Sequence, residues 1–166
     1  MSEDLLKIEN LSIDFIDVSH RKKIIKNISM NLKEGEILGL VGESGSGKSM
    51  TGLAINSLLD DKKFIRKEGK IFFEGQDILK KREQDLLKIR GNKISMIFQE
   101  PMLSLNPVQT LKTQICEVIK LHLTNDESEY QTIIESVFAK CGLEYNHKIL
   151  NSYPHMLSGG QRQRAM

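Results

Sequence analysis

The sequence predicts an α/β fold in which a small antiparallel sheet is followed by a buried strand, a glycine-rich loop and a run of helices. Three observations predict it. Apolar and polar residues alternate over residues 6–32, an apolar run at 36–41 leads directly into a glycine-rich segment at 42–49, and apolar residues recur at helical spacing after Pro107. The 39% hydrophobic and 28% charged residues are typical of a globular chain, and 166 residues suffice for one domain.

The first two predicted strands lie on either side of a basic turn at residues 21–23. Their alternating apolar residues are Leu6, Ile8, Leu11, Ile13 and Phe15 in the first strand, and Ile28, Met30 and Leu32 in the second. Residues 36–41 (EILGLV) form a continuous apolar run, which is typical of a strand buried on both faces. A helix is expected to follow over residues 48–59.

The middle of the chain predicts a strand at 70–74, a turn at 75–77, a helix at 82–90 that ends at Gly91, and a strand at 93–98. The second half is predicted to be helical. Ile115 and Ile119 share one helical face, and a second apolar stripe over residues 133–141 ends at Gly142.

Charge and residue spacing argue against several classes of function. The net charge is only +2, and the basic stretch 21–23 has no interleaved aromatic residues, so we expect no nucleic-acid partner. Cys116 and Cys141 lack metal-site spacing, and the four histidines are scattered, so we assign none of them a metal or catalysis. The acidic start and the short apolar runs predict neither a signal segment nor a membrane span.

Residues 42–49 (GESGSGKS) match the pattern G-x-x-x-x-G-K-[ST]. Glycines let successive backbone N–H groups turn toward one anion, and the start of the following helix adds unsatisfied N–H groups and partial positive charge. Lys48 can then reach the β- and γ-phosphates, and the Ser49 hydroxyl can bind Mg²⁺. The alternative, an ordinary turn, is disfavoured by the apolar run before the motif and the helical run after it. The predicted nucleotide contacts are Gly42, Ser44, Gly45, Gly47, Lys48, Ser49 and Met50.

Residues 157–161 (LSGGQ) form a second candidate site. Ser158 is a good N-cap, and the glycines can present backbone donors to a phosphate, although an ordinary polar helix start has the same features. Residues 42–49 are called the phosphate loop. Coming after this loop, the segment resembles the signature motif of ABC transporter ATP-binding subunits. In that family the motif acts on the ATP of the opposite subunit. The resemblance assigns this role to Ser158, Gly159, Gly160 and Gln161.

Residues 94–108 (ISMIFQEPMLSLNPV) narrow the resemblance to the oligopeptide, dipeptide and nickel importer subfamily, as do residues 41–44 (VGES) and 151–155 (NSYPH). The resemblance implies that Gln99 senses Mg²⁺ and the γ-phosphate and begins the loop that contacts membrane subunits. It also implies that Phe15 stacks on adenine, whereas the place of Phe15 in a strand equally fits a packing role.

The resemblance implies the P-loop NTPase core of an ABC ATPase. Residues 1–102 are expected to hold the N-terminal antiparallel β-subdomain and the P-loop part of the core, and residues 103–166 the helical subdomain that ends in the signature. In the family, an acidic strand ending in Asp-Glu and a switch histidine follow further along, beyond Met166. We therefore expect a chain that lacks the C-terminal part of the core, as a truncation product, a broken gene or an artificial boundary, and that hydrolyses little ATP.

The implied function is that of the ATP-binding subunit of an importer, which couples binding and hydrolysis of MgATP to uptake of di- or oligopeptides. Nickel import, a soluble ABC ATPase acting on DNA or ribosomes, and a nucleotide-binding remnant without hydrolysis are the alternatives. The implied partners are a homologous ATP-binding subunit, two transmembrane permease subunits and, indirectly, a peptide-binding protein. The implied location is the cytoplasmic face of the plasma membrane. The substrate is not encoded in this chain, because selectivity belongs to the binding protein and the permeases.

Overall fold

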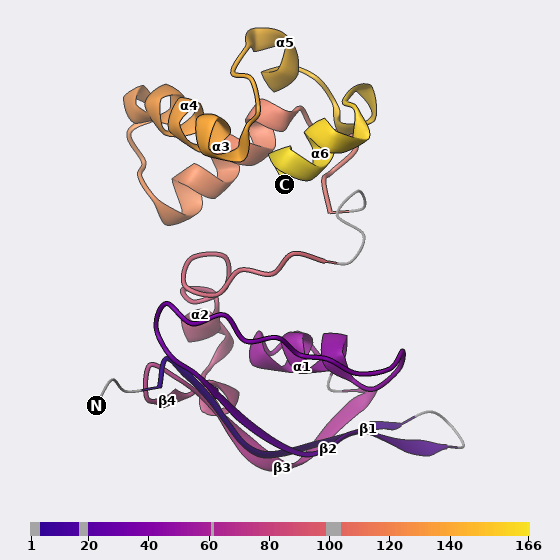
Figure 1. The fold of residues 1–166 in the computed structure, drawn as a ribbon. Coiled ribbons are helices and arrows are strands. Elements are labelled where there is room, and N and C mark those ends of the chain that lie inside the picture. Colours follow the sequence, from indigo (N-terminus) through magenta and orange to yellow (C-terminus); the bar gives the residue numbers. More distant parts are fainter. Residues whose placement is uncertain (1–3, 17–19, 61, 99–103) are drawn as a thin grey trace. The chain divides into compact units, whose positions relative to one another are not determined.

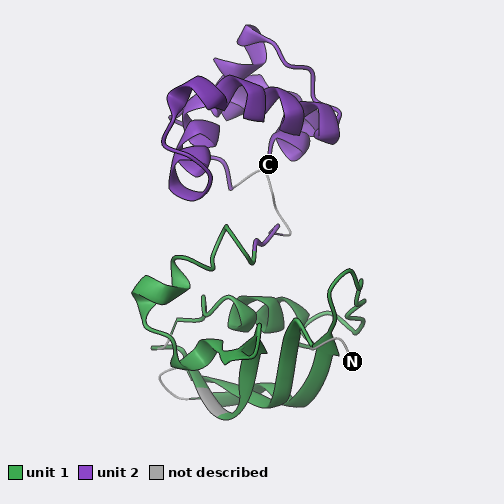
Figure 2. Cartoon of the chain, turned by 90° about the vertical axis from the view of Figure 1, so that its left-hand side faces the viewer, with its two compact units in different colours: residues 1–94 green, residues 95–166 purple. Residues whose placement is uncertain are grey.

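The computed structural model describes residues 4–16, 20–60, 62–98 and 104–166. The chain forms two compact units, Met1–Ile94 and Ser95–Met166, shown in separate colours in Figure 2. Each unit is described by itself. The predicted domain boundary between residues 102 and 103 falls within 99–103, outside the described residues, and stays a prediction.

The first unit is built on a four-stranded antiparallel sheet in the order β2-β1-β3-β4 (Figure 1). Its strands are β1 (Leu6–Ile16), β2 (Arg21–Leu32), β3 (Phe64–Phe73) and β4 (Gln76–Asp77). In the β1–β2 pair, Leu6 lies opposite Leu32 and Phe15 opposite Lys22. The predicted pair of strands is confirmed, but the predicted turn at residues 21–23 is wrong, because β2 begins at Arg21 and pairs with β1 from that residue on. The strand predicted at 70–74 matches the last four residues of the longer β3, which ends at Phe73.

A bulge in β1 explains why its buried residues Ile8 and Leu11 are three apart rather than two. Asn10 has a positive φ of 49°, and the register with both neighbouring strands shifts at this point. Gly69 on β3 fits against the bulge, because a Cβ there would lie 2.5 Å from the Leu11 Cα atom. Ile8 and Leu11 therefore both face the core.

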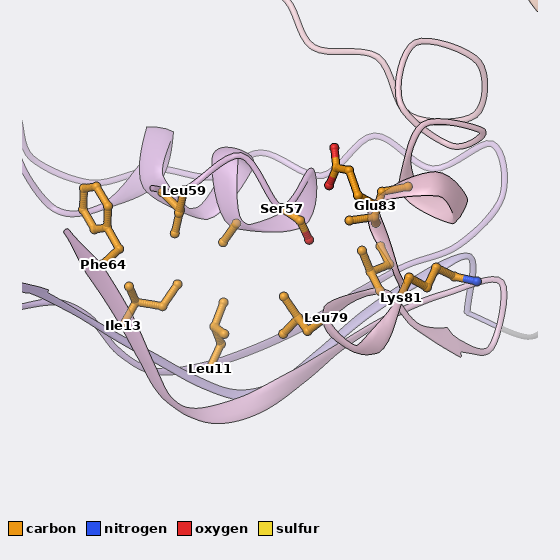
Figure 3. A pocket seen from close by; sticks show the side chains of 11 residues that line it. Leu11, Ile13, Ser57, Leu59, Phe64, Leu79, Lys81 and Glu83 are labelled. Carbon is orange, nitrogen blue, oxygen red and sulfur yellow. The ribbon is translucent and has the colours of Figure 1, made fainter. Parts of the chain in front are cut away.

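Helix α1 (Lys48–Ile55) lies across one face of this sheet (Figure 1). It ends at Ile55 rather than at the predicted Leu59, and Ser57 follows with a positive φ of 50°. The short elements η1 (Ile78–Lys80) and α2 (Glu83–Leu86) complete the unit. Between these elements, the sheet and the end of α1 lies a cavity of about 320 Å³, into which Leu11, Ile13 and Phe64 project (Figure 3). Polar side chains, among them Lys81 and Glu83, line it as well.

Two predicted strands, 36–41 and 93–98, are wrong for this structure. Both segments are irregular apart from an isolated bridge at Ile94, and Ile37, Val41 and Ile97 are 98%, 94% and 79% exposed. An apolar run becomes a strand only where neighbours accept its backbone hydrogen bonds. Within the described residues, the sheet of β1 to β4 does not provide such neighbours.

The second unit is helical, as predicted. Its elements are α3 (Leu111–His122), η3 (Glu127–Glu129), α4 (Tyr130–Cys141), α5 (His147–Leu150), η4 (Pro154–Met156) and α6 (Gly159–Ala165). Gly142 ends α4 in the left-handed conformation, with φ 65°. Leu111, Ile119, Ile134 and Phe138 form the centre of its core. Across the described ranges, the structure contains no helix with the length and apolar character needed to cross a bilayer.

Candidate functional site

The glycine-rich loop leads directly into the N-terminus of α1, and two of its glycines have conformations that favour this residue type. Gly45 and Gly47 have φ values of +79° and +95°. Gly47 is also the N-cap of α1, and a Cβ at this position would lie 2.8 Å from the carbonyl oxygen of Ile24 on β2. The loop backbone can rest against β2 at this distance only because residue 47 is glycine.

The side chain of Lys48 turns back into the loop. Its ammonium group donates hydrogen bonds to the carbonyl oxygens of Gly42 and Glu43, both at 2.7 Å, and lies 3.4 Å from the Ser46 hydroxyl. The loop itself closes tightly, because a Cβ on Gly42 would lie 2.7 Å from the Ser46 Oγ atom. The lysine charge is therefore placed within the curve of the loop.

The start of α1 has the properties of an anion-binding site. Gly47 offers no side-chain cap, and in the described chain the first turn of this helix carries no acidic residue. The first intrahelical bond runs from the N–H of Thr51 to the Gly47 carbonyl oxygen, at 2.8 Å. The preceding N–H groups, including those of Ser49 and Met50, are thus not used by the helix and can bind an anion.

Phe15 lies near the end of β1 and is half-buried. Its ring packs on Phe64 of β3, with 5.2 Å between the ring centroids and planes tilted by 55°. Sequence reasoning missed Phe64, which comes next to Phe15 only through the β1–β3 register. The pair forms one aromatic surface, and the stacking of Phe15 on adenine stays a prediction.

The neighbouring Asp14 was also missed. Its side chain is 2% exposed and is paired with the Arg21 guanidinium, with Oδ2 2.6 Å from Nε. This ion pair ties the ends of β1 and β2 together. A buried carboxylate within a strand needs such a partner, and the basic stretch that follows was the available signal.

The signature segment forms the start of α6. The Gln161 N–H donates to the Ser158 hydroxyl at 3.2 Å, and the Ser158 N–H donates to the Gln161 side-chain oxygen at 2.9 Å. In this capping box, the side-chain oxygens of Ser158 and Gln161 each accept a backbone hydrogen bond within the first turn of α6. Space around the Gly159 Cα is open, whereas Gly160 lies against the Arg164 guanidinium. The action of these residues on a partner's nucleotide stays a prediction.

Gln99 lies outside the described residues, so its predicted contact with Mg²⁺ and the γ-phosphate stays a prediction. Ser49, the other predicted Mg²⁺ ligand, is exposed in the first turn of α1. No cluster of three or more His, Cys, Asp or Glu side chains that could hold a metal ion occurs in the ranges the structure covers. A hydroxyl such as that of Ser49 fits Mg²⁺ bound mainly through phosphate oxygens and water, which does not need a protein cage.

A glycine-rich loop that encloses a lysine at the start of a helix defines a P-loop nucleotide-binding protein. The family model described as ABC transporter matches residues 25–166, and the chain belongs to the ABC transporter family. Similar peptide-transport ATP-binding proteins confirm the predicted subfamily, and solved ATP-binding cassettes confirm the predicted fold class.

Among the similar proteins is the ABC transporter ATP-binding protein YejF of Escherichia coli, with 44% identity over 100% of this chain and 31% of that protein. The dipeptide transport ATP-binding protein DppD of E. coli and the oligopeptide transport ATP-binding protein AppD of Bacillus subtilis are each 40% identical over 98% of this chain and 49% of their own length. The chain thus spans 31% to 49% of the length of these relatives.

A solved structure of a dimeric ATP-binding cassette in a post-hydrolysis state, bound to ADP and Pi, has the same fold. The TM-score is 0.81 at 26% identity, and the match covers 96% of this chain and 66% of that chain.

Proposed function

We propose that this chain is the nucleotide-binding part of an ATP-binding subunit that powers the import of di- or oligopeptides. The observation that carries the proposal is the loop geometry, with the Lys48 ammonium 2.7 Å from the carbonyl oxygens of Gly42 and Glu43 at the uncapped start of α1. The relatives DppD and AppD are dipeptide and oligopeptide transport ATP-binding proteins, which supports the substrate class.

In this proposal, the loop and Lys48 bind the phosphates of ATP. The N–H groups of the loop and of the first turn of α1 converge on the phosphate oxygens, and the Lys48 ammonium neutralises their charge. Ser49 and Gln99 contact Mg²⁺, which when bound spreads the negative charge of the β- and γ-phosphates. Phe15 supports the adenine ring. The predicted phosphate contacts also include Gly42, Ser44, Gly45, Gly47 and Met50.

The signature segment is proposed to serve a second nucleotide. Ser158, Gly159, Gly160 and Gln161 would approach the ATP held by a homologous subunit, since a capped helix start with two glycines offers backbone donors without a Cβ barrier. The dimeric cassette among the similar structures supports this arrangement. Two permease subunits and, indirectly, a peptide-binding protein complete the proposed assembly at the cytoplasmic face of the membrane.

We propose that this chain binds MgATP and that the longer proteins it resembles hydrolyse it. Water must be polarised for attack on the γ-phosphate, and the resemblance assigns that task to an acidic pair after the signature helix. Binding and turnover are therefore expected to separate in an assay of these 166 residues.

Affinity purification tests the proposed transport role. The coding sequence is tagged in its native host, membranes are solubilised in mild detergent, and partners are identified by mass spectrometry. We expect permease subunits and a second ATP-binding subunit, and a deletion strain should lose uptake of a radiolabelled tripeptide while retaining nickel uptake. Recovery with ribosomes or DNA, or loss of nickel uptake alone, would contradict the proposed function.

A further inference from the structure

The C-terminal end of α1 is held by an arginine from a distant part of the chain. Arg90 lies in the turn after α2, and its Nε donates to the carbonyl oxygen of Asn56 at 2.8 Å. One terminal nitrogen donates to the carbonyl oxygen of Ser57 at 2.7 Å, and the other is paired with the Glu83 carboxylate. The Arg90 side chain is only 20% exposed.

These contacts supply the positive charge and the hydrogen-bond donors that α1 itself lacks at its C-terminal end. The last turn of a helix has unsatisfied carbonyl groups and partial negative charge, which a cation stabilises. Within its described range, Lys48–Ile55, α1 has no basic residue in its last turn. The guanidinium of Arg90 provides this charge from 34 residues away along the sequence.

A helix of eight residues is too short to keep its geometry alone, because isolated helices become stable only at about 12 residues or more. α1 therefore depends on packing against the sheet, through buried Thr51 and Ala54, and on the contacts that hold its two ends. The N-terminal end rests on β2 through Gly47, next to the phosphate loop, and the C-terminal end rests on Arg90.

We propose that Arg90 is a positioning residue for the phosphate loop, since it fixes the far end of the helix whose first turn carries the loop. Arg90 itself is proposed to act through α1 and not by touching a phosphate. The inference rests on the proposed nucleotide binding for its effect on affinity, but its effect on the loop geometry can be measured without any ligand.

The planar guanidinium is required because two adjacent carbonyl groups are bound at once. A lysine at position 90 would keep one positive charge but lose the fork that reaches both oxygens. Arg90→Lys is therefore the informative variant. Arg82→Lys is the matched control, because Arg82 forms an ion pair with Asp85 in the same region while its side chain is 81% exposed.

The test measures MgADP affinity by calorimetry and the backbone amide signals of Gly45 and Gly47 by NMR, at a temperature where every variant is folded. Arg90→Lys should weaken MgADP binding about five- to tenfold, since the loss of one charge-assisted hydrogen bond is partly transmitted along α1. It should also shift both glycine signals in the free protein. Arg82→Lys should leave the affinity within about twofold of the original value and the signals in place.

A structural role elsewhere in the unit would not move the two glycine amides selectively. If Arg90→Lys leaves the affinity and both signals unchanged, the proposal is wrong. If Arg90→Lys does not fold, Glu83→Gln replaces it, because the loss of the carboxylate charge loosens Arg90 without removing it; unmoved glycine signals in that variant would overturn the proposal. If the original chain does not bind MgADP, the proposed function fails, while the glycine signals still decide the role of Arg90.

Discussion

Replacing Gly47 by alanine places a methyl group between the phosphate loop and β2. An alanine forced into the left-handed region costs about 1–2 kcal/mol. The new Cβ would also lie 2.8 Å from the Ile24 carbonyl oxygen, and displacing packed backbone adds about 1–3 kcal/mol. We therefore expect the Gly47→Ala variant to lose about 2–5 kcal/mol of stability in the first unit.

Gly45→Ala is the matched control, because Gly45 also has a positive φ but no described atom lies within 4 Å of a Cβ at that position. Only the cost of an alanine in the left-handed backbone conformation remains, which predicts a loss of about 1–2 kcal/mol in the stability of the first unit. The comparison thus isolates the contact between the loop and β2.

Hydrogen exchange followed by mass spectrometry provides the assay, since peptides from β2 and α1 report the opening free energy of the first unit. The three tyrosines, Tyr130, Tyr145 and Tyr153, all belong to the second unit, so tyrosine fluorescence does not report the first unit directly and the exchange measurement is needed. Equal losses for Gly47→Ala and Gly45→Ala would refute the reasoning, because the carbonyl contact would then contribute nothing.

Three further predictions follow from single residues. Ser57→Gly should stabilise the first unit by about 1 kcal/mol, as the serine has φ 50° and a buried hydroxyl without a partner among the described residues; a lower urea midpoint would contradict this. Ser158→Ala should destabilise α6 by about 1 kcal/mol through loss of the capping box, whereas Ser158→Asp should keep the cap. Amide hydrogen exchange in α6 should therefore be faster in Ser158→Ala, and equal exchange in the two variants would contradict this. Burial raises the pKa of the Cys116 thiol, so at neutral pH iodoacetamide should modify exposed Cys141 first, and Cys116 should become faster as the pH rises; faster reaction of Cys116 at neutral pH would show that the thiol is not protected.

The conformation of the glycine-rich loop at residues 42–49 could be predicted from the sequence because its requirements are local. The left-handed conformations of Gly45 and Gly47 and the position of Lys48 follow from a motif of eight neighbouring residues. The capped start of α6 was readable for the same reason, since Ser158 and Gln161 are three residues apart.

Features that depend on distant parts of the chain were not predictable. The apolar run at 36–41 has the composition of a strand, but strand formation requires partners that composition does not reveal. Gly69 is needed because of the bulge in the opposite strand, and Phe64 meets Phe15 through the sheet register. Arg90 reaches the end of α1 across 33 and 34 residues, and no spacing rule signals such a contact.

Binding of MgATP to the purified 166-residue chain tests the central claim most directly. Titration calorimetry should give a saturable isotherm for the original chain and for Lys120→Ala, which removes an exposed lysine in α3. Lys48→Ala should bind at least about tenfold more weakly, because the charge within the loop is gone. An original chain that does not bind MgATP, or a Lys48→Ala variant that binds as tightly as Lys120→Ala, would contradict the assignment of residues 42–49 as a phosphate site.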